Sequence, residues 1–139
     1  AELESLAREL GVEARVVVTP PRDDVRELMA SAACVLQLSR LAETFGRTVL
    51  EALSLGVPVV GYAHGGVGEL LDKLHPEGAI EPGRVDLAAS RVAQILAERP
   101  AIALLADYRL EDMQRRTLAL YESLARSPAS AAAAAGGPA

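Results

Sequence analysis

The clearest strand signal in the chain is the run VPVVGY at residues 57–62. It is apolar throughout and not only at every second position, which predicts a strand buried on both faces of a parallel sheet. Pro58 stands at its entrance, where no ladder donor is required. A second apolar run, CVLQL, occupies residues 34–38, and a helical stretch at 45–55 lies between the two runs, with Gly56 as its stop. This order of strand, helix and strand predicts the α/β class.

A third apolar run lies upstream of this core, ARVVVT at residues 14–19, and predicts another buried strand that is closed by two prolines. A predicted helix over residues 2–10 precedes it. A second predicted helix over 25–32 follows it, and Asp23 or Asp24 is the expected N-cap. The alternation of helix and strand therefore starts at the beginning of the chain.

The same alternation continues downstream. A short helix is predicted over 67–73, a weak strand over 78–80, and then a helix that Asp86 caps. A long helical stretch ends near residue 125. The final segment, residues 127–139, is rich in alanine, glycine and proline without periodicity, and we expect it to be disordered.

The predicted elements together make a Rossmann-like parallel sheet with helices on both faces, formed by residues 1–126. A doubly wound domain normally has more strands than the three or four counted here. This chain also opens on a helix. We therefore expect a partial domain that is truncated at its N-terminal side.

Composition narrows the class of protein. The 139 residues are 50% hydrophobic and 24% charged, as in a globular domain. Nineteen acidic and fourteen scattered basic residues give a net charge of -5 and no basic face, so nucleic acid is not an expected partner. Cys34 is the only cysteine, which excludes an internal disulfide and favours a buried structural thiol. The sequence has no membrane-spanning run and no secretion signal, so a cytoplasmic location is expected.

Two loops are expected to carry the ligand site, because ligands of open parallel sheets bind beyond the carboxyl ends of the strands. One loop spans residues 39–46 and the other spans residues 63–68. Each leads into a helix, whose first N–H groups and dipole attract phosphate. Glycines such as Gly46, Gly65 and Gly66 remove side chains that would hold a ligand away from the backbone.

Two carboxylates flank this anion site. Glu43 lies just before the predicted helix, and Glu51 lies roughly two turns into it. Carboxylates accept hydrogen bonds from vicinal hydroxyls, so one can hold a ribose and the other a transferred sugar. Arg47 is suited to neutralising a pyrophosphate leaving group. The spacing therefore favours a sugar nucleotide as ligand.

Plainer interpretations stand beside these. Glu51 and Arg47 are also typical of a solvated helix surface, and Glu43 of a residue that complements a helix dipole. His64 is either a donor to phosphate or sugar, or an incidental loop histidine. The aspartate pair at residues 23–24 is better explained as a helix cap than as a metal site.

At these residues the sequence resembles the C-terminal domain of family 4 glycosyltransferases. The matching elements stand in the same order and spacing, apart from one extra residue between Ser39 and Glu43. They are Ser39, ETFG at 43–46, EA at 51–52, GVPVV at 56–60 and GGVGE at 65–69. The variant around the last motif is similar to transferases that build bacterial lipopolysaccharide or other surface glycans.

The resemblance implies the C-terminal half of a GT-B fold and a transfer that retains anomeric configuration, by same-face attack and without a metal or other cofactor. It makes Glu43 the catalytic residue, in contact with donor-sugar hydroxyls, and it assigns the nucleotide ribose to Glu51. The diphosphate would meet the amides near Gly46, Arg47 and Thr48. The full predicted donor-binding set is Glu43, Phe45, Gly46, Arg47, Thr48, Glu51, His64, Gly65 and Gly66.

The implied function is binding of a nucleotide-diphosphate sugar and transfer of its hexose to a glycan or lipid-linked acceptor. The acceptor would be held by an N-terminal domain that this chain lacks, and the full enzyme would touch the inner membrane face peripherally. The alternative is a catalytically inactive nucleotide-sugar-binding or interaction module derived from such an enzyme. Sugar-nucleotide epimerases share the architecture but not this spacing of glutamates.

Overall fold

The computed structural model describes residues 2–103 and 108–126. The chain forms two compact units, residues 1–102 and residues 103–139. The elements of the first unit are α1 (Glu2–Glu9), η1 (Glu13–Arg15), α2 (Val25–Ser31), β1 (Val35–Gln37), α3 (Arg47–Ser54), β2 (Val59–Tyr62), α4 (Gly65–Leu74), η2 (Pro76–Gly78), β3 (Ala79–Ile80) and α5 (Val85–Glu98). The second unit contains α6 (Leu110–Ala125).

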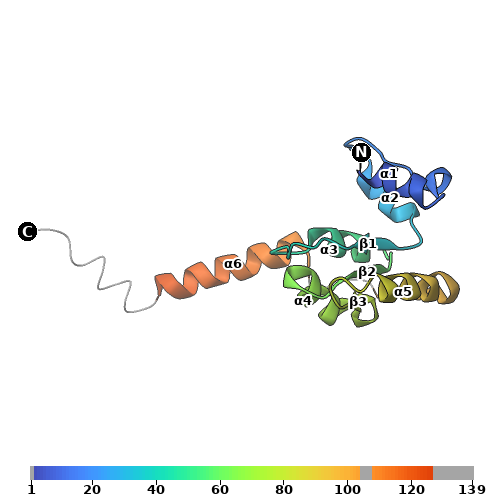
Figure 1. Cartoon of the computed structure of the whole chain (residues 1–139). Helices are drawn as coiled ribbons and strands as arrows, with labels where there is room; N and C mark the ends of the chain where they lie inside the picture. Colours follow the sequence, from blue (N-terminus) through green and yellow to red (C-terminus); the bar gives the residue numbers. More distant parts are fainter. Residues whose placement is uncertain (1, 104–107, 127–139) are drawn as a thin grey trace, which may run out of the picture. The chain divides into compact units, whose positions relative to one another are not determined.

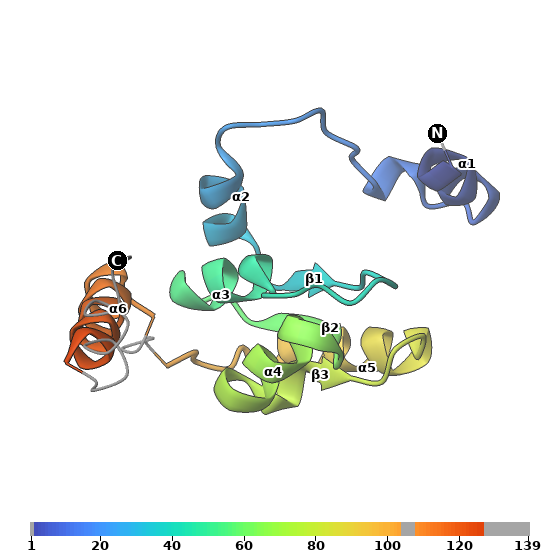
Figure 2. The same cartoon turned by 90° about the vertical axis from the view of Figure 1, so that its left-hand side faces the viewer.

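The sheet of the first unit has three parallel strands in the order β1, β2, β3, as Figure 2 shows. Val35 is the partner of Val59, and Gly61 lies between Gln37 and Ala79. β2 is buried at all four positions because strands flank it on both edges and helices cover both its faces. The predicted α/β class with a parallel sheet is confirmed.

Helices cover both faces of this sheet. On one face Val60, Tyr62 and Ile80 pack with Ala88 and Ile95 of α5 into a buried cluster. On the other face α3 and α4 lie over β2, on the opposite side from α5 in Figure 1. Alternate residues of β2 therefore serve two separate layers of core, as expected of a Rossmann-like domain.

The opposite face shows why β2 carries a glycine. A Cβ added at Gly61 would lie 3.0 Å from Leu71 Cδ1 and 3.1 Å from Val67 Cγ1. α4 thus packs close to the strand, because Gly61 has no side chain in the way.

The strand predicted at residues 14–19 is wrong. Residues 13–15 form η1, and Val16 has extended dihedral angles of φ −112° and ψ 123° but no ladder partner among the described residues. Val17 is 85% exposed. An extended apolar segment becomes a strand only when a neighbouring strand accepts and donates its backbone hydrogen bonds.

The helix predicted at residues 2–10 is present as α1, and Gly11 follows it with a φ of +64°, as in a glycine helix stop. Its apolar face is exposed at Leu3, Leu6 and Leu10, and Ala7 is its one buried residue. The periodicity thus gave the helix but not the burial of its leucine face.

Neither expected aspartate cap forms a capping hydrogen bond. Asp24 is the N-cap of α2 by position, but its carboxylate accepts a 2.7 Å hydrogen bond from Arg22 Nε. Asp86 lies inside α5, whose N-cap is Arg84. In both places an arginine two residues earlier donates hydrogen bonds to the carboxylate.

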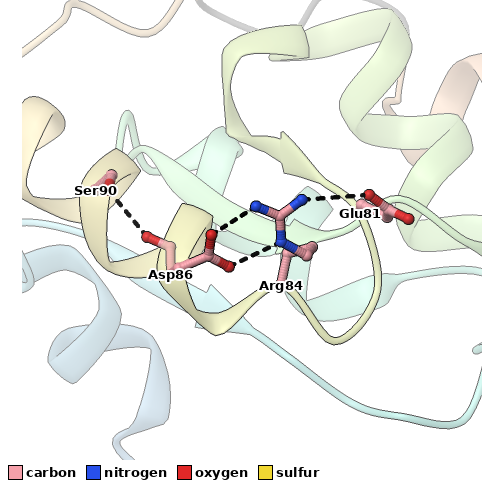
Figure 3. A network of polar contacts seen from close by, with 4 residues as sticks. All are labelled: Glu81, Arg84, Asp86 and Ser90. Atoms are coloured by element: carbon pink, nitrogen blue, oxygen red, sulfur yellow. Dashed lines mark hydrogen bonds and ion pairs between the residues drawn. The ribbon is translucent and has the colours of Figure 1, made fainter.

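Arg84 is the centre of an exposed network at the start of α5, shown in Figure 3. Its Nε and guanidinium Nη2 donate to Asp86 at 2.9 and 2.6 Å, and Nη1 lies 3.8 Å from Glu81. Ser90 Oγ donates to the Asp86 carbonyl at 2.9 Å. The hydrogen bonds from Arg84 lower the pKa of Asp86 to about 2.

His75 ends α4 and is buried, with 4% of its surface exposed. Its Nδ1 lies 3.6 Å from Glu77, while its Nε2 has no hydrogen-bond partner in the described part of the chain. Burial lowers the pKa of this imidazole, since desolvation disfavours the charged ring.

Cys34 precedes β1 and is half-buried against the cluster that α5 covers. Its Sγ lies 3.6 Å from the Val35 carbonyl oxygen, and burial raises the pKa of the thiol. This placement supports the structural role expected of the residue.

The second unit is described through residue 126, so the predicted disordered tail at 127–139 lies outside the described residues. α6 confirms the long helical stretch that was expected to end near residue 125. Over residues 2–103 and 108–126, no helix is both long and apolar enough to cross a membrane.

Candidate functional site

The candidate site is formed by the two loops that leave neighbouring strands. Loop 39–46 joins β1 to α3, and loop 63–68 joins β2 to α4 and forms its first turn. Because β1 and β2 are adjacent and parallel, both loops start at the same edge of the sheet. The sequence places both there, as predicted for a ligand site of this fold.

Backbone contacts join the two loops. The Gly66 N–H donates a 2.7 Å hydrogen bond to the carbonyl oxygen of Glu43. A Cβ added at Gly66 would lie 2.5 Å from the carbonyl carbon of Phe45, and one at Gly65 would lie 2.5 Å from the Glu43 oxygen. The loops therefore touch through positions where no side chain larger than glycine fits.

The same crowding is found at Gly46, which has a φ of +74° and would place a Cβ 2.9 Å from the Val67 nitrogen. Gly68 would place one 2.8 Å from the Ala63 carbonyl carbon. These glycines were predicted to let a ligand approach the backbone. The first physical effect of Gly46, Gly65 and Gly66 is to let one loop approach the other, whereas Gly68 lets the loop at 63–68 turn tightly on itself. Ligand contact at Gly46, Gly65 and Gly66 stays a prediction.

Glu43 is half-buried between the loops, and its Oε1 accepts a hydrogen bond from Nε2 of Gln37, the last residue of β1. The rigid strand end thus orients the carboxylate. Gln37 was not among the predicted site residues. Its signal was available, because it is the only polar residue in an otherwise apolar strand and it stands at the carboxyl end.

α3 offers free donors to an anion. α3 begins at Arg47, two residues later than predicted. The residue before it, Gly46, has left-handed dihedral angles, so the right-handed helix cannot extend back through it. Among the described residues, no acceptor receives the backbone N–H groups of Gly46, Arg47 or Thr48. This helix start has the geometry and the positive dipole end that bind phosphate.

Arg47 and Glu51 are paired on the surface of α3. Arg47 Nε donates a 2.6 Å hydrogen bond to Glu51 Oε1, and the two side chains are 83% and 45% exposed. Glu51 lies just over one turn into the helix and not the predicted two, because the helix starts later. Both side chains remain accessible to a ligand at the helix start.

His64 is the N-cap of α4, and its half-buried ring Nε2 lies 3.1 Å from the carbonyl oxygen of Ser39. The ring also meets Tyr62 edge to face, with centroids 6.2 Å apart. Phe45, in contrast, has a 57% exposed surface and Thr48 is half-buried. The structure therefore brings the nine predicted residues into two contacting loops and the first helical turns that follow them.

Fold and site define a Rossmann-like domain with its candidate ligand site at the carboxyl edge of a parallel sheet. The chain belongs to the group 1 glycosyltransferases, since the family described as "Glycosyl transferases group 1" matches residues 1–111. Its homologues are GT-B glycosyltransferases.

Three curated relatives carry this likeness. N-acetyl-alpha-D-glucosaminyl L-malate synthase of Bacillus anthracis is 33% identical over 93 residues, which are 67% of this chain and 24% of that protein. The 2-deoxystreptamine glucosyltransferase of Streptomyces kanamyceticus is 32% identical over 98 residues, 69% of this chain and 25% of the relative. The lipopolysaccharide glucosyltransferase WaaG of Escherichia coli K12 is 41% identical over 68 residues, which are 45% of this chain and 18% of that protein. The chain spans about a quarter of the length of the first two.

Solved structures agree with this placement. The chain is similar to Anabaena HepE in complex with UDP-glucose, with a TM-score of 0.61, 35% identity and coverage of 70% of this chain and 27% of that one. The complex of HepE with UDP and glucose gives a TM-score of 0.62 at 26% identity, with coverage of 91% and 36%. One of these two HepE structures thus holds a sugar nucleotide, and the other holds UDP and glucose.

Proposed function

We propose that this chain is the donor-binding domain of a retaining glycosyltransferase of family 4, and that its donor is a uridine-diphosphate hexose. The observation that carries the proposal is the joint placement of Glu43, the free amides of α3 and Glu51 at one edge of the sheet. The complexes of HepE with UDP-glucose, and with UDP and glucose, support uridine as the base.

The diphosphate binds at the start of α3, where the amides of Gly46, Arg47 and Thr48 point toward it. Arg47 adds a full positive charge, and its long, exposed side chain leaves Glu51 to reach the phosphates. As the bond between the sugar and the diphosphate breaks, negative charge grows on the leaving group. Donors that are already fixed in place stabilise that charge most effectively.

The two carboxylates hold the two sugar rings of the donor. Glu43 accepts hydrogen bonds from hydroxyls of the transferred hexose and is the catalytic residue, and Glu51 accepts those of the ribose. Phe45, Gly65 and Gly66 complete the wall around the hexose and diphosphate, and His64 precedes these glycines as the N-cap of α4. The acceptor hydroxyl attacks the face that the diphosphate leaves, so that the anomeric configuration is retained.

The transfer needs no metal ion in this proposal. The helix amides and Arg47 would supply the positive charge instead. Undiminished binding of UDP-glucose in excess EDTA is the expected result, and its loss would contradict metal independence.

The acceptor is a glycan or lipid-linked sugar, and the remainder of the enzyme holds it. The likeness to a lipopolysaccharide glucosyltransferase supports a bacterial surface glycan as the product. Such an enzyme would work in the cytoplasm, in peripheral contact with the inner membrane face.

Titration calorimetry of the full chain with UDP and UDP-glucose tests the proposal. Both ligands should bind, and Glu51→Ala should weaken both by about tenfold or more, because it removes charge-assisted hydrogen bonds to the shared ribose. Glu27→Gln, an exposed change on α2, is the matched control and should have no effect. Absence of UDP binding by the wild-type chain, or an unchanged Glu51→Ala variant, would contradict the donor site.

A further inference from the structure

His64 makes the only side-chain hydrogen bond between the two site loops in the described part of the chain. Its ring Nε2 lies 3.1 Å from the carbonyl oxygen of Ser39, 25 residues earlier. A carbonyl oxygen only accepts hydrogen bonds, so Nε2 must carry the proton and donate it. The ring is half-buried and lies edge to face against Tyr62, which fixes its direction from β2.

The contacts of loop 39–46 show what this hydrogen bond adds. The end of the loop is fixed by backbone, because Gly66 N–H donates to the Glu43 oxygen at 2.7 Å and Gly46 packs against Val67. At the start of the loop, Ser39 Oγ makes only local contacts with Leu41, at 3.0 and 3.3 Å. His64 is therefore the contact that ties the start of the loop to α4.

We propose that His64 is a positioning residue for donor binding, which holds the Ser39 carbonyl and thereby keeps loop 39–46 in the shape that presents Glu43 to the hexose. The inference rests on the proposed function and adds to it the device that orders the site. His64 acts through Nε2 on the protein itself, so its contribution reaches the sugar end of the donor through Glu43.

A comparison of UDP with UDP-glucose distinguishes this positioning role from direct contact of His64 with the phosphates. A positioning residue that acts on Glu43 affects ligands that carry the hexose. A phosphate ligand affects UDP and UDP-glucose alike, since both contain the diphosphate. The donor position on the ring matters as well, because a glutamine amide nitrogen reaches as far as Nε2 and an asparagine amide does not.

Calorimetry of variants of the whole 139-residue chain tests the proposal. His64→Ala and His64→Asn should bind UDP-glucose about fivefold more weakly, the loss typical of one hydrogen bond, and should bind UDP within about twofold of wild type. His64→Gln should restore UDP-glucose binding to within about twofold. Asp72→Asn, an exposed change on α4, is the matched control.

A parallel loss of UDP and UDP-glucose affinity, or a His64→Gln variant as weak as His64→Ala, would overturn the positioning role. If His64→Ala fails to fold, the comparison of His64→Gln with His64→Asn carries the same test. A wild-type chain that binds neither ligand contradicts the proposed function, which is a different result from binding that His64→Ala leaves unchanged.

Nitrogen-15 NMR of the unliganded chain reads the contact itself without any donor. The chain has two histidines, and a His75→Gln background leaves His64 as the one imidazole signal. At neutral pH the proton should reside on Nε2. A ring protonated at Nδ1 would overturn the hydrogen bond to Ser39, whatever the calorimetry gives.

Discussion

At the residue scale, Gly66 shows that the site depends on the absence of a Cβ atom at the point where the two loops touch. Its Cβ would stand 2.5 Å from the Phe45 carbonyl carbon and 2.6 Å from the Phe45 Cα. Both are backbone atoms, so no rotation of a flexible side chain relieves the clash. The neighbouring loops would have to separate.

Gly66→Ala should therefore lower the thermal midpoint, by an amount corresponding to about 1–3 kcal/mol of overpacking. It should also abolish UDP-glucose binding, because the separation displaces Glu43. Gly83→Ala is the matched control, since its Cβ meets nothing within 4 Å and its cost comes only from a φ of +83°. Calorimetry that finds UDP-glucose bound equally well by both variants would contradict the close-packing argument.

Gln37 is the second residue for which the structure gives a clear expectation. Its amide orients the Glu43 carboxylate by a hydrogen bond. Gln37→Leu should weaken UDP-glucose binding about threefold to tenfold and leave UDP binding unchanged. The substitution removes one hydrogen bond from a neutral amide to the charged carboxylate of Glu43. Gln37→Glu should weaken it further, because two carboxylates repel each other. A uniform loss for both ligands would show that Gln37 supports the fold and not the carboxylate.

At the scale of elements, the C-cap of α4 is a titratable residue, His75, whose imidazole is buried away from solvent. His75 is buried and its pKa is lowered below the ordinary 6.5 by desolvation. The unfolded chain therefore binds a proton more readily than the folded chain below pH 6.5. Stability from this group is present in full above that pH and is lost as the pH falls toward the folded pKa.

Urea unfolding at a series of pH values checks this expectation. The free energy of unfolding should rise with pH up to 6.5, and His75→Gln should remove that part of the slope. His64→Gln is the control, because it removes the other imidazole of the chain. A slope that survives in His75→Gln would assign the pH dependence to other groups.

Elements also show how far the sequence predicts this fold. The run at 57–62 and the helical stretch at 45–55 were found because burial and period are local signals. The strand predicted at 14–19 is wrong, because a strand needs a neighbouring strand to pair with, and the sequence of the segment alone does not specify that neighbour. Asp24 and Asp86 were misjudged as caps, because an arginine two residues earlier competes for each carboxylate.

The candidate site divides in the same way. Motif spacing pointed to Glu43, Arg47 and Glu51, and the structure has Glu43 in the loop before α3 and Arg47 and Glu51 on α3 itself. Motif spacing did not reveal the hydrogen bond between Gln37 and Glu43 or the contact of His64 with Ser39. Contacts across 25 residues follow from how adjacent parallel strands bring their loops together, and spacing along the chain does not encode them.

At the scale of the whole molecule, every predicted donor residue lies in the first compact unit, residues 1–102. Donor binding should therefore not depend on α6. A protein of residues 1–102 should bind UDP-glucose within about twofold of the full chain, if the shorter protein retains its circular dichroism spectrum and thermal midpoint. A folded 1–102 protein that has lost UDP-glucose binding would assign part of the donor site to residues 103–139.

The interlocking of loops 39–46 and 63–68 has a consequence for the engineering of donor preference. Each loop has been shaped to the backbone of the other, through Glu43 against Gly66 and Gly46 against Val67. A chimera that takes one loop from a relative with a different sugar combines two halves that do not fit. Exchanges between relatives should therefore move both loops together as one cassette.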